Sequence, residues 1–562
     1  MSLLVAKTKE QIKNTIISAV NKAINENILE SAELPDFAVE VPANREHGDY
    51  AVNAAMVWAR AFRKAPRQIA EIILSNCDTF GTYIDKMEIA GPGFINIFLN
   101  DSYYADIVAD VCKKGEDYGK SDFGKGERVL VEFVSANPTG PMHIGNARGG
   151  ALGDCLAAVL SSAGYYTERE FYINDAGNQI NKFGLSLDLR YLELYKDGIE
   201  MPEDSYHGED IIAHAKAFAE IHGDSFVDKS EAERRKALVE FALPKNIEGL
   251  ERDLAKYRIK YDTWFKESTL HNNGETSRII ELLKESGHTY TEEDALWFKA
   301  TDFGCDKDFV LVRANGVPTY VVPDIAYHYN KLVTRKFDKA IDILGADHHG
   351  YVPRLKAALT ALGVDASRLD VVLMQMVRLV KEGEVIKASK RSGKAITLVT
   401  LLDEVPIDAA RFFFNLREPN SHFDFDLDLA VNESNQNPVY YVQYAYARIC
   451  SILRNLEAEG IAKRDVTVEE LKLLKLPEEK ELILHISALT DEIIASAKAY
   501  DPAKITHYVE ELATKFHKFY SACRVKGEDE ALMQARLTLC FATGIVIKNV
   551  LTLMKIDAPE KM

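Results

Sequence analysis

The sequence predicts a multidomain α/β protein, in which a Rossmann-type domain with a helical insertion lies between an N-terminal α+β domain and a C-terminal all-helical bundle. Three observations support this prediction. The chain of 562 residues is too long for one hydrophobic core. Residues 129–173 have the pattern of a strand, a helix and a second strand. Only helical patterns follow Pro438.

The N-terminal domain is predicted over residues 1–118. Apolar residues at four-residue spacing between Ile12 and Ile24 indicate an amphipathic helix over residues 8–27. The short apolar run 93–99 follows a Gly-Pro-Gly turn and indicates a strand. Residues 113–128 are rich in glycine and charge, so we expect a linker there.

The central domain is predicted over residues 119–435. Residues 129–134 form a nearly continuous apolar run, which is typical of a buried parallel strand. A Gly/Pro-rich loop then leads into a helix of small residues that ends near Ala163, with Gly164 as its C-cap. Residues 166–173 indicate the second strand.

The rest of the central domain is predicted to contain an insertion and further strands. Residues 181–268 have charged helical patterns and indicate an insertion. Strands are expected over residues 308–322, with a hairpin turn at Asn315-Gly316, and over residues 339–344. The C-terminal bundle is predicted over residues 436–562.

The composition is ordinary for a soluble globular protein, with 47% hydrophobic and 27% charged residues. No run of about 18 apolar residues occurs and no signal peptide is evident, so no membrane association is expected. The seven cysteines stand singly, which argues against a disulfide framework or a Cys-rich zinc site and suits a cytoplasmic protein. A net charge of −18 lacks the usual basic footprint of nucleic-acid binding, although a local basic face can still hold phosphates.

Residues 143–146 predict an ATP site, because they stand where the first strand and its loop give way to a helix. A helix N-terminus offers unpaired N–H groups and a partial positive charge to a phosphate. His143 and Asn146 can donate hydrogen bonds there, and Gly145 lets an adenosine lie against the backbone. The alternative is a plain strand–helix connection in which these residues are incidental.

A second phosphate-binding segment is indicated by residues 387–394, which hold four cations in eight residues. Such a loop suits a pyrophosphate leaving group, whose charge grows as the bond to the α-phosphate breaks. A solvated charge run is the alternative. Ser389 and Gly393 between the cations, and a helix-like pattern from Thr397, favour the phosphate site.

Together the two segments resemble the HIGH and KMSKS signatures of class I aminoacyl-tRNA synthetases, and the wider sequence resembles the arginyl-tRNA synthetase family. The stretches that carry this resemblance are VEFVSANPTGPMHIGNARGGALGD, GVPTYVVPDIAYHYNK, ILGADHHGYVPRLKAAL, IKASKRSGKAITLVTLLDEVPIDAARFFF and NPVYYVQYAYARI. They occur in the family's order, and the resemblance extends over nearly all of the chain. Asn146 stands in place of the second histidine of the class signature, and Ala388 in place of its methionine.

The resemblance implies an arginine–tRNA ligase. The carboxylate of L-arginine would attack the α-phosphate of ATP and release diphosphate, and the arginyl-adenylate would then esterify the 3′-terminal ribose of tRNA(Arg) and release AMP. His143, Lys387 and Lys390 are the expected catalytic residues, because positioning and charge stabilisation carry such chemistry. The expected ATP contacts are His143, Gly145, Asn146, Ser389 and Lys390. Mg²⁺ is expected on the phosphates of ATP, without a protein cage around it.

The resemblance also implies which residues bind arginine. A guanidinium is best met by a carboxylate in bidentate geometry, and Asp324 matches the family's guanidinium-binding position. The other expected contacts are Glu132, Ser135, Asn137, Tyr320 and His348. For Glu132 the alternative is a structural ion pair. For residues 347–349 the alternative is a metal site, against which the lack of a third ligand argues.

The flanking domains are implied to bind tRNA. Residues 436–562 resemble the family's anticodon-binding domain, and residues 1–118 its domain for the tRNA elbow. Tyr440, Tyr444 and Arg448 are the expected contacts, because unpaired bases stack on aromatic rings and guanidinium planes. At least half of the tyrosines around them are expected to fill the core instead. The enzyme is expected to be a monomer.

Two other classes of protein stay open. An adenylate-forming ligase or nucleotidyltransferase without a tRNA partner would make the N-terminal domain and the helical bundle superfluous. A catalytically inactive tRNA-binding paralogue would have no use for His143, Gly145, Ser389 and Lys390.

Overall fold

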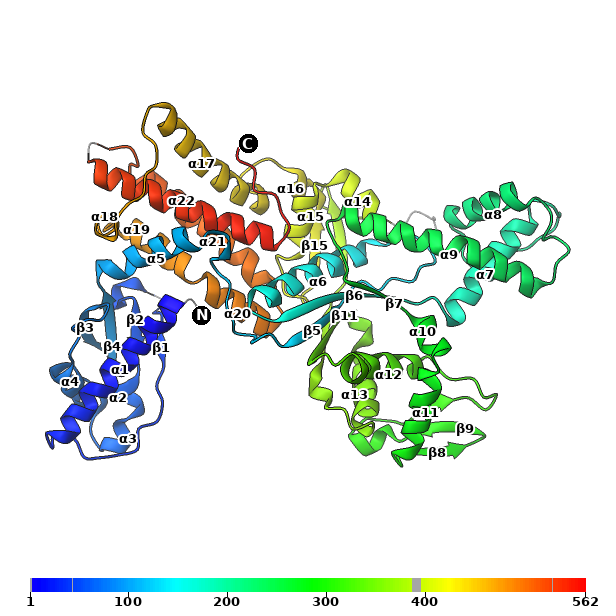
Figure 1. The fold of residues 1–562 in the computed structure, drawn as a ribbon, viewed down its shortest axis with the longest axis horizontal. Coiled ribbons are helices and arrows are strands. Elements are labelled where there is room, and N and C mark those ends of the chain that lie inside the picture. The colour runs from blue at the N-terminus through cyan, green and yellow to red at the C-terminus, as the bar shows by residue number, and fades with distance from the viewer. Residues whose placement is uncertain (1–2, 43, 387–395, 528) are drawn as a thin grey trace.

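The computed structural model describes residues 3–42, 44–386, 396–527 and 529–562. The molecule is elongated, with the N-terminal domain at one end and a helical insertion at the other (Figure 1). A parallel sheet lies between these ends, and the C-terminal helices return to lie beside the N-terminal domain.

The N-terminal domain is a four-stranded antiparallel sheet with helices packed on it, in the strand order β1-β2-β4-β3. Its elements are α1 (Leu3–Asn25), β1 (Val39–Glu40), β2 (Tyr50–Val52), α2 (Ala54–Val57), α3 (Ala59–Phe62), α4 (Pro66–Asn76), β3 (Ile84–Ala90) and β4 (Phe94–Leu99). Ile12 and Ile16 of α1 are fully buried, as their spacing predicts. The predicted helix and strand of this domain are thus confirmed as α1 and β4.

The segment that joins this domain to the next is held against the C-terminal helices. Its helix α5 (Asp101–Lys114) contacts α18 (Val468–Leu471), α19 (Pro477–Ser487) and α22 (Glu530–Leu553). The Asn549 amide donates hydrogen bonds to the carbonyls of Gly115 and Tyr118 (2.9 and 3.1 Å). The predicted linker therefore belongs to a packed interface.

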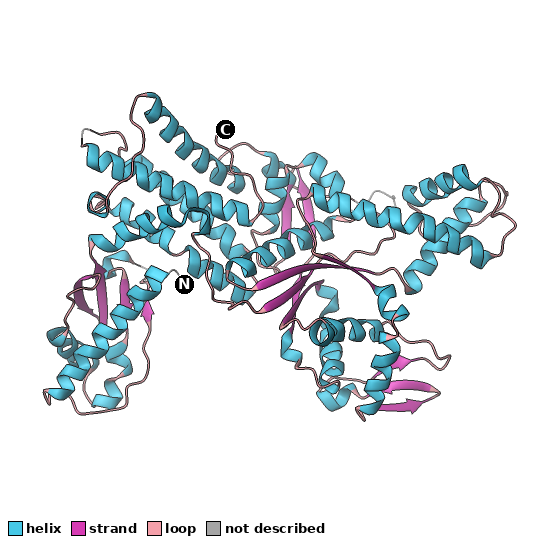
Figure 2. Cartoon of the chain, viewed as in Figure 1, coloured by secondary structure: helices cyan, strands magenta, loops and turns pink. Residues whose placement is uncertain are grey.

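The central sheet has five parallel strands in the order β12-β11-β5-β6-β7. They are β5 (Arg128–Glu132), β6 (Tyr166–Ile173), β7 (Thr263–Lys266), β11 (Lys339–Gly345) and β12 (Leu369–Met374). The predicted strands at 129–134, 166–173 and 339–344 are confirmed as β5, β6 and β11. Figure 2 shows the sheet with helices on both sides.

Each face of the sheet has its own core. Val131 and Ile341 pack with α6 (Ile144–Ser162) on one face. Ala340 and Leu369 pack with α12 (Val321–Tyr329) and α13 (Val352–Ala361) on the other. The helix α6 lies close to the sheet, since a Cβ on Gly153 would come within 2.2 Å of the Phe133 ring. The small residues of α6 therefore serve close helix–sheet packing.

The insertion is helical, as predicted, but shorter than residues 181–268. It consists of α7 (Gly177–Leu192), α8 (Glu209–His222) and α9 (Glu231–Lys256), around a core of its own. Residues 263–266 are the strand β7, which pairs with β6 in parallel. The prediction of helix there is wrong, because pairing at the sheet edge determines the conformation of these four residues.

The prediction of a strand through residue 322 is also wrong. The hairpin turn at Asn315-Gly316 is confirmed, because Val312 at the end of β10 (Phe309–Val312) forms an antiparallel bridge with Pro318, but the helix α12 begins at Val321. Pro323 lies in the first turn of α12, where a missing N–H costs no hydrogen bond. Val321 and Val322 are β-branched and therefore suggested a strand, but a proline in the next position is equally compatible with the start of a helix.

The remaining elements of the central domain flank the sheet. They are α10 (Glu267–Asn272), α11 (Glu275–Glu285), β8 (Thr289–Glu292), β9 (Ala295–Phe298), β13 (Val377–Lys381), β14 (Glu384–Val385), α14 (Leu398–Glu404), α15 (Ile407–Phe414), β15 (Phe423–Asp426) and α16 (Leu427–Val431). The sequence did not predict the small sheets β10-β9-β8 and β14-β13-β15.

The C-terminal bundle consists of helices in its described residues, as predicted. Besides α18, α19 and α22 it contains α17 (Pro438–Ala458), α20 (Leu489–Ala499) and α21 (Ala503–Ala522). Among the described helices, α22 alone is long and apolar enough to cross a membrane, yet most of it is buried in this bundle. Its composition is that of a core helix.

Candidate active site

The parallel sheet has a switch point between β5 and β11. From β5 the chain continues to β6 and β7 on one side, and then returns to β11 and β12 on the other. Ligands of such sheets bind beyond the carboxyl ends of the strands at this point. A cavity of about 490 Å³, which we call the first cavity, lies there and is lined by residues including Glu132, Asp324 and Tyr351.

A second cavity of about 520 Å³ adjoins the first. Its lining includes Thr139, His143 and Asn146, together with Tyr206 and Asp210 of the insertion. Val134 and Ser135 line both cavities. A ligand in one cavity can therefore lie beside residues that line the other cavity.

The chain turns sharply where the two cavities meet. Val134 and Ser135 have φ angles of +70° and +40°, a left-handed conformation that is costly for a β-branched residue such as valine. The Ser135 hydroxyl donates a hydrogen bond to Glu132 (2.8 Å) and accepts one from the Tyr172 N–H (3.1 Å). These bonds hold the strained turn at the end of β5.

His143 lies at the N-terminus of α6, as predicted. It is exposed to solvent, and its backbone N–H donates a hydrogen bond to the side-chain oxygen of Asn146 (3.0 Å). The helix begins at Ile144, and Gly145 has open space where a Cβ would be. The mouth of α6 is therefore accessible to an anionic ligand.

Residues 142–144 pair with residues 396–398. His143 forms an antiparallel bridge with Thr397, and the Ile144 N–H donates to the Ile396 carbonyl (3.1 Å). The predicted residues Lys387, Ser389 and Lys390 lie outside the described residues. The first described residue after them, Ile396, is nevertheless fixed beside the mouth of α6.

The insertion holds the loop of the second cavity. The Asn246 amide of α9 donates a hydrogen bond to the Pro138 carbonyl (3.0 Å). The oxygen of the same amide bonds to Nε2 of His214 on α8 (2.7 Å). The loop before His143 is thus tied to two helices of the insertion.

Asp324 lies in the first turn of α12 and faces the first cavity. The Tyr351 hydroxyl donates a hydrogen bond to one of its oxygens. Burial raises the pKa of Asp324 to about 6, against the effect of this hydrogen bond. A carboxylate that is costly to ionise alone favours a cationic ligand.

Glu132 has a cationic partner already. The buried Lys331 ammonium donates hydrogen bonds to Glu132 and, at 2.8 Å, to Asp342. The alternative of a structural ion pair at Glu132 is therefore confirmed, while its contact with a substrate stays a prediction.

The other predicted arginine contacts divide between the cavities. Ser135, Tyr320 and His348 line the first cavity, and Tyr320 is 75% exposed at its rim. Asn137 lines the second cavity with His143 and does not line the first. Near His348 and elsewhere in the described chain, no three His, Cys, Asp or Glu side chains are grouped to hold a metal.

The predicted tRNA contacts gather on the first helix of the bundle. Tyr440 and Tyr444 stack with ring centroids 6.4 Å apart, and the Arg448 guanidinium lies 4.8 Å from the Tyr444 ring centroid. All three line a cavity of about 610 Å³ with His517, whose pKa burial lowers to about 4. Tyr446 is buried, as expected for a core tyrosine. Half-exposed aromatic rings beside a guanidinium can stack on unpaired bases.

Several side chains of these sites were not found from the sequence, among them Lys331, Tyr351 and Asn246. Each contacts a residue that is distant in the chain or on another element. No spacing rule signals such contacts.

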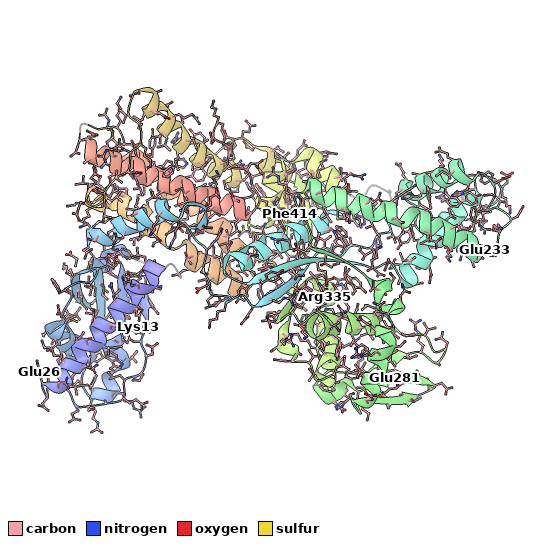
Figure 3. All side chains as sticks on the ribbon, viewed as in Figure 1. Lys13, Glu26, Glu233, Glu281, Arg335 and Phe414 are labelled. Carbon is pink, nitrogen blue, oxygen red and sulfur yellow. The ribbon has the colours of Figure 1, made fainter. Side chains whose placement is uncertain are left out.

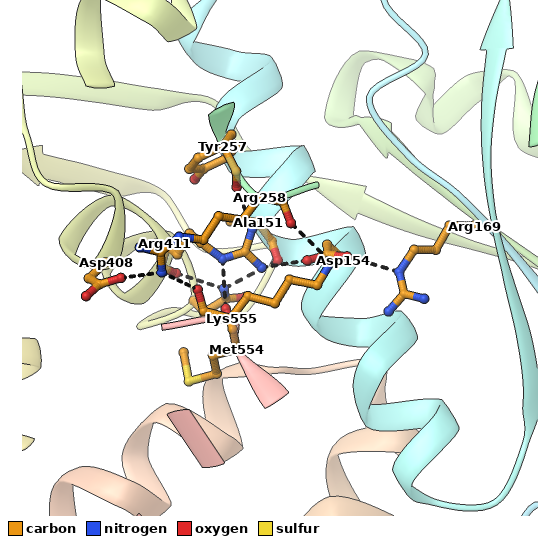
Figure 4. Close-up of polar contacts among 10 residues, drawn as sticks. Ala151, Asp154, Arg169, Tyr257, Arg258, Asp408, Arg411, Met554 and Lys555 are labelled. Carbon is orange, nitrogen blue, oxygen red and sulfur yellow. Dashed lines mark hydrogen bonds and ion pairs between the residues drawn. The ribbon is translucent and has the colours of Figure 1, made fainter. Parts of the chain in front are cut away.

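A buried hub joins α6 to the end of the chain (Figure 4). The Asp154 carboxylate on α6 pairs with Arg169 (3.0 Å), Arg411 (2.6 Å) and Lys555 (2.7 Å). Arg411 also donates to the Met554 carbonyl (2.7 Å). The residues after α22 are thereby held on the helix that begins at the candidate ATP site.

Three family models match the chain in order. The model "Arginyl tRNA synthetase N terminal domain" matches residues 10–99. The model "tRNA synthetases class I (R), catalytic domain" matches residues 108–433, and "DALR anticodon binding domain" matches residues 442–562. These matches define a class I aminoacyl-tRNA synthetase.

Individual relatives make the assignment narrower. An arginine–tRNA ligase of Acetivibrio thermocellus is 53% identical and covers 100% of both chains, and one of Bacillus subtilis is 47% identical over 99% of both. A solved putative arginyl-tRNA synthetase of Campylobacter jejuni superposes with a TM-score of 0.74 at 34% identity, over 83% of this chain and 100% of its own. The Thermus thermophilus arginyl-tRNA synthetase has the same fold, with a TM-score of 0.73 at 21% identity over 97% and 99%. The chain belongs to the arginyl-tRNA synthetase family.

Proposed function

We propose that the protein is an arginine–tRNA ligase whose two adjoining cavities hold arginine and ATP. The observation that carries this proposal is that they meet at Val134 and Ser135. The first has Asp324 in its wall, which suits a guanidinium, and the second opens at the N-terminus of α6, which suits a phosphate. The arginine carboxylate can then attack the α-phosphate of ATP across the shared turn, and the resulting adenylate can pass to the 3′-terminal ribose of tRNA(Arg).

In this proposal ATP lies against His143, Gly145 and Asn146. The open space over Gly145 leaves room for an adenosine, and His143 can donate a hydrogen bond to a phosphate oxygen. Lys387, Ser389 and Lys390 complete the site from the segment before Ile396, where cations stabilise the leaving diphosphate.

Mg²⁺ accompanies ATP in this proposal and neutralises its phosphates. Asp210 in the wall of the second cavity has a buried carboxylate oxygen without a hydrogen-bond partner among the described residues. That oxygen is a donor of the kind that Mg²⁺ accepts, so the residues present fit the ion.

Arginine lies in the first cavity, with its guanidinium on Asp324 and beside Tyr320. Ser135, Glu132 and His348 line the same cavity and are assigned to the rest of the amino acid. Asn137 reaches the substrate from the second cavity, where the reacting carboxylate must lie.

Binding of tRNA is assigned to the surface of Tyr440, Tyr444 and Arg448, and elbow binding to residues 1–118. We further propose a monomeric, cytoplasmic enzyme. The seven free thiols suit a reducing compartment.

ATP–diphosphate exchange, measured with each amino acid in the presence and absence of tRNA(Arg), tests the proposal. Exchange with arginine and the formation of arginyl-tRNA are expected. Activation of a different amino acid, or formation of an adenylate that never reaches tRNA, would contradict it.

A further inference from the structure

Two carboxylates face each other at the switch point of the sheet. Glu132 of β5 and Asp342 of β11 are direct partners in the register of these parallel strands. Both line the first cavity. Like charges in such positions destabilise a sheet unless a cation lies between them.

Lys331 supplies that cation. Its side chain is fully buried, and its ammonium bonds to one oxygen of each carboxylate. The other oxygens are also bonded, Glu132 by the Ser135 hydroxyl (2.8 Å) and Asp342 by His328 Nε2 (2.6 Å). Although burial alone would raise the pKa of Asp342, Lys331 and His328 hold it well below its usual value.

Among the described residues, no other lysine or arginine pairs with Glu132 or Asp342. Arg335, labelled in Figure 3, is the next cation along the chain and pairs instead with Glu170 of β6 (2.6 Å). The Lys331 ammonium is also held 4.1 Å from the centroid of the Tyr327 ring. Lys331 follows α12 in a short π-helical segment, Asn330–Thr334, an insertion of the kind often found at functional sites.

Asp324 differs from these two carboxylates. Its hydrogen bond comes from the neutral hydroxyl of Tyr351, and no ion pair with a lysine or arginine reaches it among the described residues. Apart from the exposed Asp347 at its rim, the first cavity thus contains two carboxylates with a resident cation and one without.

We propose that Lys331 is a positioning residue that determines where the substrate cation binds. Its ammonium occupies the Glu132–Asp342 pair, which leaves Asp324 inside the cavity for the guanidinium. This fixes the register of arginine, and therefore the reach of its reacting carboxylate into the second cavity. The inference rests on the proposed arginine site.

The test replaces the cation by an apolar side chain of similar length, Lys331→Met. The freed carboxylates then offer the guanidinium a second position, so arginine still binds but lies out of register. We expect its Kd, from calorimetry, to change by less than about threefold. The kcat of arginine-dependent exchange should fall about thirtyfold, because a misplacement of the reacting groups by about 1 Å is enough to lower the rate to this extent.

Lys339→Met is the matched control. Lys339 lies at the opposite end of β11 and pairs with Asp370 (2.6 Å) away from both cavities. Its loss likewise removes a lysine that pairs with a carboxylate of the sheet, so kcat and KM should stay within about twofold of the wild type.

The double variant Lys331→Met/Asp342→Asn guards against misfolding of the single variant. Removing both partners of a buried pair is far less costly than removing one. With one competing carboxylate gone, kcat should recover about tenfold relative to the single variant, to within about threefold of the wild type, and the wild type is the reference if Lys331→Met does not fold.

Three results would overturn the inference: a kcat within threefold of the wild type in Lys331→Met, a loss of arginine affinity in proportion to the loss of rate, or no rescue in the double variant. Failure of the proposed function would look different. The wild type and Lys339→Met would then not activate arginine at all.

Discussion

Asp154 and Arg411 form a fully buried ion pair, with 2.6 Å between the Arg411 guanidinium and the Asp154 carboxylate. Asp154 lies on α6, whose N-terminus faces the second cavity, and Arg411 lies on α15. Arg169 and Lys555 bind the same carboxylate, so three cations share one anion. The stability of the core and the geometry of α6 depend on this contact.

Replacing Asp154 with asparagine should therefore be strongly destabilising. Arg411 would stay buried without its counter-ion, which typically costs about 3–5 kcal/mol in the free energy of unfolding. Urea unfolding followed by circular dichroism measures this change. Asp424→Asn, which removes the exposed pair with Arg378, is the control and should cost no more than about 1 kcal/mol. An equal loss of unfolding free energy in the two variants would contradict a stabilising role for the ion pairs of Asp154.

His143→Ala should lower the kcat of arginine activation about 100-fold or more, because one donor to the reacting phosphates is lost. The Kd for tRNA(Arg) should be unchanged, since His143 lines the second cavity and not the cavity of Tyr440, Tyr444 and Arg448. Diphosphate exchange and filter binding measure the two quantities. His349→Ala, an exposed histidine outside both cavities, is the control. Loss of tRNA affinity together with activity would point to misfolding.

Arginine activation should depend on the ionisation of Asp324. Its pKa is raised to about 6, so the carboxylate becomes protonated, and unable to pair with a guanidinium, as the pH falls below this value. We expect kcat/KM for arginine to fall about tenfold per pH unit there. Asp324→Asn should raise the arginine KM at least about thirtyfold. Asp347→Asn, an exposed neighbour in the cavity rim, should leave the arginine KM unchanged within about threefold.

The same shift predicts a stability effect of known sign. Because the folded-state pKa lies above the unfolded value, the protonated group favours folding below pH 4, and this contribution is lost as the pH rises through 6. Asp324→Asn should therefore be more stable than the wild type at pH 7, by up to about 3 kcal/mol, with no such gain at pH 4. Melting temperatures at the two pH values test it; a gain at pH 4 as large as at pH 7 would contradict it.

Replacing Tyr444 or Arg448 with alanine should weaken tRNA(Arg) binding about tenfold each, the usual worth of a stacked base. Arg448→Ala should also reduce the salt dependence of the Kd, because a cation near the backbone is lost. Tyr446→Phe on the same helix is the control, since Tyr446 is buried. An unchanged Kd in both alanine variants would place the anticodon surface elsewhere.

The sequence predicted the parts of the fold that rest on local patterns. The apolar runs of β5, β6 and β11 and the spacing in α1 define these elements without reference to the rest of the chain. Strand β7 was missed because its four residues depend on pairing with β6, and Val321–Val322 were misread because β-branched residues can also begin a helix at a proline.

The candidate site could be predicted only in part: residues in motifs were found, and residues that contact them through the tertiary structure were not. Glu132, Asp324 and His143 were found from their motifs and do line the two cavities. Lys331 could not be found, because its partners lie on two strands that become neighbours only when the sheet assembles. The charge balance of a buried cluster is a property of the tertiary structure.

The bridge between His143 and Thr397 also bears on the order of folding. The two segments are joined through nearly all of the central domain, including the insertion and four strands of the sheet. Closing so long a loop is entropically unfavourable until the intervening elements are in place. The mouth of α6 should thus be among the last features to form, so a partly folded chain should not yet bind ATP there.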